Sequence, residues 1–121
     1  MEKTFYGKPK IQKVDRHRAF IPSKARQLIG GNLVYLVYIN EDLIRCYTPE
    51  AYEKTKDDML QRSRDDSERQ AYFLGQICRI DDSGRIMLNA KMSELEKVIF
   101  APNGDVIDIY NPKQFHYKHI I

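Results

Sequence analysis

Short apolar runs separated by polar turns recur along this chain, and they predict a mixed α+β fold rich in strands. Runs of this length with many β-branched and aromatic residues are typical of strands, and two pairs of them are joined as hairpins. A period-two alternation near the N-terminus indicates one more strand. The predicted strands are 10–14, 19–21, 33–39, 43–47, 76–80, 86–88, 98–101 and 106–110.

Helix signals fall between these strands. The segment 23–29 predicts a short helix closed by Gly30-Gly31. Thr48-Pro49-Glu50 supplies a hydroxyl cap, a proline at the first helical position and an acid in the first turn, so a longer helix is expected to run to about Arg62. We further expect a polar connection over 63–69, a short buried helix over 71–74, a helical turn over 89–95 and a second helix start at 111–113.

The same order of elements occurs twice. Residues 18–22 match 85–89 at a shift of 67, and residues 40–49 match 103–112 at a shift of 63. Two matches in the same order predict an internal duplication. The expected organisation is a first repeat at 1–62 with a C-terminal helix, a connection at 63–75 and a second repeat at 76–121, together one integrated domain.

Charge along the chain is uneven, although the net charge of +3 is modest for 121 residues. Seven basic residues lie between positions 8 and 26, opposed only by Asp15, whereas 41–68 is rich in acids. Such a cluster is the electrostatic footprint expected for contacts to nucleic-acid phosphates. The basic residues are Lys8, Lys10, Lys13, Arg16, Arg18, Lys24 and Arg26.

Other function classes are disfavoured by what the sequence lacks. No apolar run approaches the roughly 20 residues that span a bilayer, and no apolar signal-peptide core is present, so we expect no membrane partner and a cytoplasmic location. Cys46 and Cys78 are interpreted as two buried thiols in preference to a disulfide. No phosphate loop, nucleophile-base arrangement or metal cluster stands out, so we expect no enzyme activity, no small-molecule substrate and no cofactor or metal.

Several segments resemble the MraZ family, within the SpoVT–AbrB group of swapped-hairpin proteins. They are Phe5-Tyr6-Gly7, the run from Arg18 to Arg26, 47–52, 69–75 and the turn from Asp81 to Arg85. The chain departs from the pattern where Asp15 and Arg18 are one residue closer than Asp81 and Arg85, and where Asn89 replaces a proline.

The resemblance implies two tandem repeats that form a pseudo-twofold swapped-hairpin β-barrel with flanking short helices and one longer helix. It also implies a bacterial DNA-binding transcriptional regulator, a repressor of the cell-division and cell-wall gene cluster. Such a protein associates with the nucleoid, assembles as a ring-like homo-oligomer and reads double-stranded operator DNA with direct repeats. Subunits with weak individual contacts would gain affinity by engaging several half-sites together.

Basic side chains on the two hairpins are the candidate DNA contacts, since an arginine on a strand-borne turn can bond guanine bidentately in the major groove. Arg85 could instead, or in addition, pair with Asp81. Arg16 and His17 could simply be solvated at the turn tip, and Lys24 and Arg26 could cap the C-terminus of their helix. Arg18 has few local acids and is the favoured contact. The DNA-binding candidates are Lys10, Lys13, Arg16, His17, Arg18, Lys24, Arg26 and Arg85; Asp15, Asp81 and Gly84 are the predicted turn-stabilising residues.

Two further groups of residues, a pair of aspartates and four tyrosines, are given structural roles. Asp81 and Asp82 lack a neighbouring base or nucleophile, so a turn role is favoured over catalysis. Tyr35, Tyr38, Tyr47 and Tyr110 are expected to pack in the core or between subunits.

The alternative function is an AbrB- or MazE-type antitoxin module that binds DNA and a toxin partner. A second ordered unit, however, here occupies the place of the usual toxin-wrapping tail.

Overall fold

A computed structural model describes residues 4–62 and 76–115 of the chain. The predicted connection 63–75, including the helix expected at 71–74, lies outside the described residues. The elements are β1 (Lys10–Asp15), β2 (Arg18–Phe20), α1 (Ser23–Ile29), β3 (Leu33–Asn40), β4 (Leu43–Tyr47), α2 (Pro49–Arg62), β5 (Gln76–Arg79), β6 (Arg85–Met87), the 3-10 turn η1 (Met92–Glu94), β7 (Lys97–Asn103) and β8 (Val106–Tyr110).

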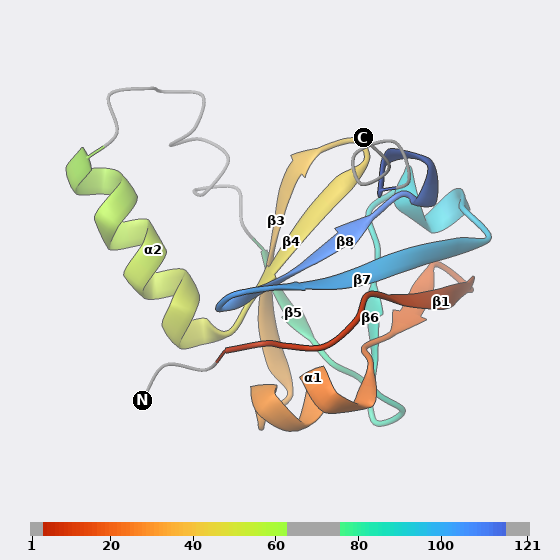
Figure 1. The fold of residues 1–121 in the computed structure, drawn as a ribbon, viewed down its shortest axis with the longest axis horizontal. Coiled ribbons are helices and arrows are strands. Elements are labelled where there is room, and N and C mark those ends of the chain that lie inside the picture. Colours follow the sequence, from red (N-terminus) through yellow and green to blue (C-terminus); the bar gives the residue numbers. More distant parts are fainter. Residues whose placement is uncertain (1–3, 63–75, 116–121) are drawn as a thin grey trace.

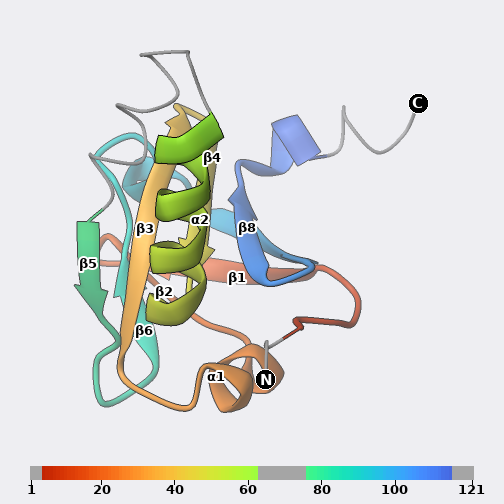
Figure 2. The same ribbon diagram turned by 90° about the vertical axis from the view of Figure 1, so that its left-hand side faces the viewer.

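The eight strands form one antiparallel sheet that curls into a nearly closed barrel, which confirms the predicted α+β class. The strand order is β5-β3-β4-β8-β7-β1-β2-β6, so β5 and β6 are the two edges. Figures 1 and 2 show α1 at one end of this barrel and α2 at its side, where the start of the helix lies nearest the sheet and the later turns lead away from it. None of the described helices is long and apolar enough to cross a membrane.

The hairpins β3–β4 and β1–β2 are interleaved in the sheet with the strands of residues 76–115. β1 pairs with β7, β3 with β5, β2 with β6 and β4 with β8, all antiparallel. The β2–β6 pairing is centred on Ala19 opposite Ile86, and the β4–β8 pairing on Arg45 opposite Asp108. Residues 4–62 therefore bury their strand edges against residues 76–115 instead of forming a sheet of their own.

Alternation along the strands separates an interior from an outer face. Val34, Leu36, Ile44 and Phe100 point inward and belong to the main core. On the outer face, Tyr52 of α2 stacks on Tyr35 at 4.1 Å between ring centroids and meets Tyr47 edge-on at 5.9 Å. Tyr110 is buried and packs edge-on against Phe115 at 5.4 Å. Tyr38 packs against the main core, so the four tyrosines pack as predicted, and Tyr35 and Tyr47 join α2 to the barrel.

Local chemistry explains the helix ends. The Ala51 N–H donates to Thr48 Oγ1 at 3.2 Å, so threonine caps α2 as predicted. Gly30 ends α1 with φ of 73°, a left-handed conformation that glycine adopts at little cost. Asn89, the residue in the place of proline, accepts the Met92 N–H at 2.8 Å and starts η1. The helical turn expected over 89–95 is therefore present only as this short 3-10 segment.

Several strand boundaries differ from the prediction by one or two residues. β2 and β6 begin one residue early, at Arg18 and Arg85, because both arginines pair across the sheet. β7 continues through Pro102 and Asn103, which were predicted as turn. Pro102 pairs with Ile107 of β8, whereas the pairing of β7 with β1 ends at Phe100. No strand pairs with Pro102 on the β1 side, so its missing N–H removes no hydrogen bond of the sheet there.

Candidate nucleic-acid interface

The central feature of the site is the pair of short strands β2 and β6 at one edge of the sheet, called the ribbon below; β2 also pairs on its other side with the end of β1. Arg18 lies opposite Met87, Ala19 opposite Ile86, and Phe20 opposite Arg85. Ala19 and Ile86 are buried in the core, and alternation therefore places the other two pairs on the outer face. The two arginines occupy diagonal corners of this outer face, about two residues apart along the ribbon.

Asp81 lies between these arginines and contacts both. Its Oδ2 is 2.9 Å from Arg85 Nε and 3.4 Å from Arg18 Nη1. Its Oδ1 accepts the backbone N–H groups of Ser83 at 3.0 Å and Arg85 at 2.9 Å. The Arg85–Asp81 pairing, the alternative role predicted for Arg85, is thus present. Arg18 has few acids near it in sequence, but it pairs with Asp81, which lies 63 residues away along the chain.

The same contacts lower the pKa of the Asp81 carboxyl. The hydrogen bond from the backbone N–H of Arg85 is the main cause. Desolvation, the second-largest effect, raises the pKa against it, and the Arg85 guanidinium and the Ser83 N–H lower it further. The carboxylate therefore stays charged at neutral pH and orients both guanidinium groups toward one side of the ribbon.

The first hairpin turn presents Arg16 and His17, both exposed, at its tip. Their φ angles are 51° and 70°, the left-handed pair of a type I′ turn, which usually carries asparagine and glycine. Asp15 pairs with Arg18 through the backbone, but within the described residues its carboxylate makes no hydrogen bond or ion pair. The stabilising role predicted for Asp15 thus has no contact in the structure to support it.

The second turn, by contrast, is held by side chains. Gly84 has a φ of 89° and donates its N–H to the Asp81 carbonyl at 2.9 Å. Arg26 reaches over this turn from α1, with its Nη2 3.5 Å from the Asp82 carbonyl. A Cβ built on Gly84 would lie 2.5 Å from Arg26 Nη1, so only glycine allows this close approach.

The predicted lysines divide into two places. Lys13 lies on the outer face of β1 opposite Lys97, and this is the face that carries Arg18 on the neighbouring strand. Lys10 lies on the other face opposite Phe100 and lines a small hollow with Lys24, whose ammonium is 6.0 Å from the Tyr6 ring centroid. The structure thus gathers Lys13, Arg16, His17, Arg18 and Arg85 with Arg26 around the ribbon, and sets Lys10 and Lys24 apart.

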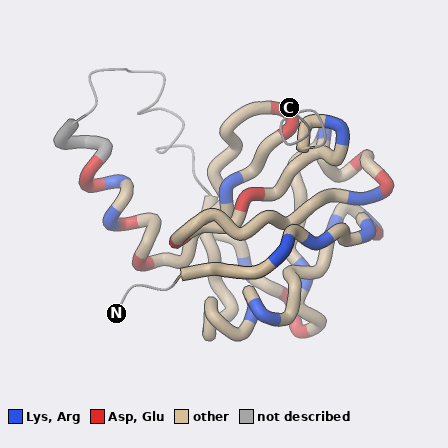
Figure 3. Tube along the Cα trace, in the orientation of Figure 1, with Lys and Arg blue, Asp and Glu red and all other residues tan. Residues whose placement is uncertain are grey.

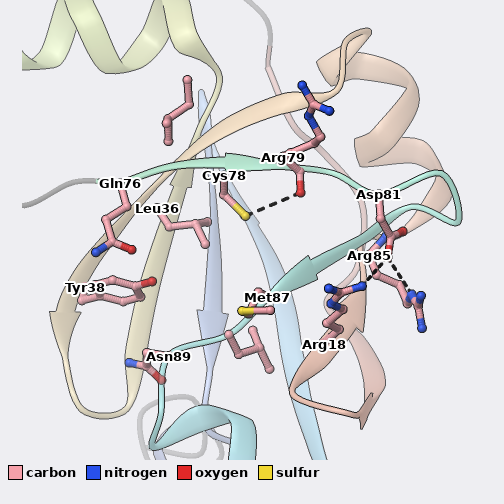
Figure 4. Close-up of a pocket in the computed structure, with 12 residues that line it drawn as sticks. Arg18, Leu36, Tyr38, Gln76, Cys78, Arg79, Asp81, Arg85, Met87 and Asn89 are labelled. Atoms are coloured by element: carbon pink, nitrogen blue, oxygen red, sulfur yellow. Dashed lines mark hydrogen bonds and ion pairs between the residues drawn. The ribbon is translucent and has the colours of Figure 1, made fainter.

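A hollow of about 570 Å³ opens where the edge strands β5 and β6 separate (Figure 4). Arg18, Asp81 and Arg85 lie at one end of it and Tyr38, Gln76 and Asn89 at the other. Cys78, half-buried and free, lies between them; Cys46 is also free but fully buried, which raises the pKa of its thiol to about 12. The prediction of two buried thiols therefore holds for Cys46 and overstates the burial of Cys78.

The sequence interpretation missed two large apolar side chains at the site. Phe20 and Met87 are 47% and 51% exposed on the outer face of the ribbon. In strands of three residues, the alternation of inward and outward side chains does not repeat often enough to show which apolar residue faces outward. Within 4–62 and 76–115, no group of three or more His, Cys, Asp or Glu side chains is placed to hold a metal ion.

No protein-family model matches this chain, and no curated protein matches it.

Proposed function

We propose that the protein is a sequence-specific, double-stranded DNA-binding transcriptional regulator that reads DNA with the outer face of the β2–β6 ribbon. The observation that carries the proposal is the diagonal pair Arg18 and Arg85 on this face, oriented by one shared carboxylate. A two-stranded ribbon fits the major groove, and a guanidinium can bond guanine O6 and N7 together.

Charge around the ribbon supports the proposal. Lys13 and the exposed Arg16 extend the positive surface along β1 and its turn, and Arg26 extends it at the other end. Figure 3 shows Lys and Arg along β1, whereas α2 carries both signs on the far side of the barrel. Long basic side chains beside the reading surface suit phosphate contacts, which supply most of the sequence-independent affinity.

The strained tip of the first hairpin is a second supporting feature. A left-handed conformation costs a non-glycine residue about 1–2 kcal/mol, and Arg16 and His17 both adopt it. Such strain is commonly retained at functional sites. The basic tip therefore fits a role in contacting DNA better than a role in stabilising the turn.

We also propose that the barrel arose as a tandem repeat with swapped hairpins. At the shift of 67 residues, Ala19 pairs with its own counterpart Ile86, and Arg18 pairs with the counterpart of Phe20. Two backbone hydrogen bonds follow the same shift: Ile21 N–H to Gly84 O and Leu88 N–H to His17 O, both 2.9 Å. At the shift of 63 residues, Arg45 pairs with its counterpart Asp108. An approximate twofold axis through both pairs accounts for these registers.

Together with the sequence resemblance, these features make an MraZ-like regulator the proposed identity. We accordingly propose a ring-like homo-oligomer that engages direct operator repeats, acts as a repressor and associates with the nucleoid. Ring assembly would be tested by sedimentation velocity with and without a duplex carrying spaced repeats.

The proposal is tested with duplexes selected from a random pool and titrated by fluorescence anisotropy. Arg18→Ala and Arg85→Ala should each weaken specific binding at least tenfold, in keeping with loss of one bidentate base contact. Lys113→Ala, an exposed residue in the helical turn after β8, is the matched control and should bind like the wild type. Unchanged binding by both arginine variants, or affinity insensitive to salt between 50 and 200 mM, would contradict the proposal.

A further inference from the structure

Two exposed apolar side chains on the ribbon each face a candidate DNA-contacting arginine across the strand pair. Met87 lies opposite Arg18, and Phe20 lies opposite Arg85. Building on the proposed function, we propose that Phe20 and Met87 contact thymine methyl groups in the major groove. They would thereby select A·T pairs close to the guanines bonded by the arginines.

The chemistry of the groove supports this assignment. Thymine is the base that presents a methyl group there, and apolar side chains recognise it by contact. Side chains directly opposite in an antiparallel pair have Cβ atoms about 4.5–5.5 Å apart, and base pairs rise by about 3.4 Å. An arginine and the apolar residue opposite it would therefore reach the same or neighbouring base pairs. Each end of the ribbon would read one guanine and one nearby thymine.

The Phe20 side chain is also held in place before DNA arrives. The Arg85 guanidinium carbon is 5.8 Å from the centre of the Phe20 ring, and Asp81 holds that guanidinium. The backbone between the two pairs is fixed by the buried residues Ala19 and Ile86. Preorganised contacts lose little conformational freedom on binding, which favours both affinity and specificity.

A second copy of the chain fits this face less well. A twofold contact through the ribbon would bring Arg18 and Arg85 of one copy against the same arginines of the other, with one Asp81 in each copy to offset them. Like charges brought together without compensation disfavour an interface. The alternation of guanidinium and apolar groups instead matches the alternation of polar base edges and methyl groups in the groove.

Deoxyuridine substitution tests the inference, since it removes the methyl group and leaves the base pairing unchanged. Each thymine of the selected duplex is replaced in turn, and binding is measured with the wild type, Met87→Gln and Phe20→Ala. We expect the wild type to lose about fourfold at the contacted thymines, the factor for one methyl-sized apolar group. Each variant should bind more weakly and lose its sensitivity to substitution at its own thymine.

Two further variants separate recognition from folding. Met87→Leu keeps an apolar tip and should keep the sensitivity to deoxyuridine, and Ile11→Ala, at a 64% exposed site on β1, should behave as the wild type. If every deoxyuridine duplex binds as tightly as its parent while Arg18→Ala still weakens binding, the methyl contact is wrong and the proposed function stands. If no duplex is enriched by the selection, both are wrong.

Discussion

Asp81 contacts two arginines from the adjacent strands β2 and β6, and its charge therefore controls how freely both can meet DNA. Asp81→Asn removes this charge but keeps an oxygen that can accept the Ser83 and Arg85 N–H groups, so the turn should persist. We expect nonspecific duplexes to bind about fivefold more tightly, because a repelling charge next to two guanidinium groups is lost. Anisotropy titrations against a random-sequence duplex measure this.

The control for that substitution is Asp82→Asn, in the same turn but exposed. It should raise nonspecific affinity less, since among the described residues only the Asp82 carbonyl, and not its carboxylate, contacts an arginine. Equal effects of the two variants would show that Asp81 acts only through the overall charge of the turn.

The lowered pKa of Asp81 also gives a stability prediction. A carboxyl whose pKa is lower in the folded state contributes stability above its ordinary value of 3.8, and this contribution is lost as the pH falls through the lower folded value. The difference in unfolding free energy between the wild type and Asp81→Asn should therefore shrink as urea titrations are moved from pH 6 toward pH 2. A difference that stays constant over this range would contradict the assignment.

Glycines 84 and 31 provide a matched pair. Gly84→Ala should lower the unfolding free energy by about 1–2 kcal/mol, because alanine disfavours the positive φ and must displace Arg26. Gly31→Ala has no atom within 4 Å of the added carbon and should change stability by less than about 0.5 kcal/mol. Urea unfolding of both variants measures this, and equal losses would contradict the role of Gly84.

At the scale of elements, the hairpin β1–β2 carries an unfavourable turn sequence. Replacing Arg16 and His17 by Asn and Gly supplies the residues that a type I′ turn prefers, and should raise the unfolding free energy by about 1–2 kcal/mol. The same double variant should bind the selected duplex more weakly, because the tip loses its positive side chain. If the double variant raised both the unfolding free energy and the DNA affinity, or lowered both, the role of the tip in contacting DNA would be contradicted.

The sequence predicted most elements because their signals are local. Thr48-Pro49-Glu50 start α2 and Gly30 ends α1, as expected from capping chemistry alone. It could not predict that Arg18 would meet Asp81, since that contact joins residues 63 apart in sequence. Nor could it predict that Phe20 would face outward, because a three-residue strand offers no repeat of the alternation.

At the scale of the whole molecule, a part-buried ion pair joins the neighbouring strands β4 and β8. Asp108 Oδ1 is 2.8 Å from Arg45 Nε, and its Oδ2 accepts from Asn103 Nδ2 at 2.9 Å. The Asp108 side chain is only 3% exposed, against 29% for Arg45. The hydrogen bond to Asp108 raises the pKa of Arg45, so the guanidinium stays charged within the sheet.

Removal of this carboxylate should therefore weaken the whole barrel. Asp108→Ala is expected to cost about 2–3 kcal/mol, below the full cost of breaking a fully buried pair because Arg45 retains some water. The control is Glu41→Ala, which breaks the exposed pair with Lys91 at 2.7 Å and should leave the urea midpoint unchanged. Similar midpoints for the two variants would contradict a central role for Asp108.

The interleaving of strands also bears on how the protein can be made. During translation β1, β2 and β4 leave the ribosome before their partners β7, β6 and β8 exist. Their open edges must remain unpaired until residues 85–110 follow, and such edges readily join other chains. Synthesis rate between residue 47 and residue 110 thus sets how long a nascent chain is exposed to misassembly, and a pause there would be more harmful than a pause earlier.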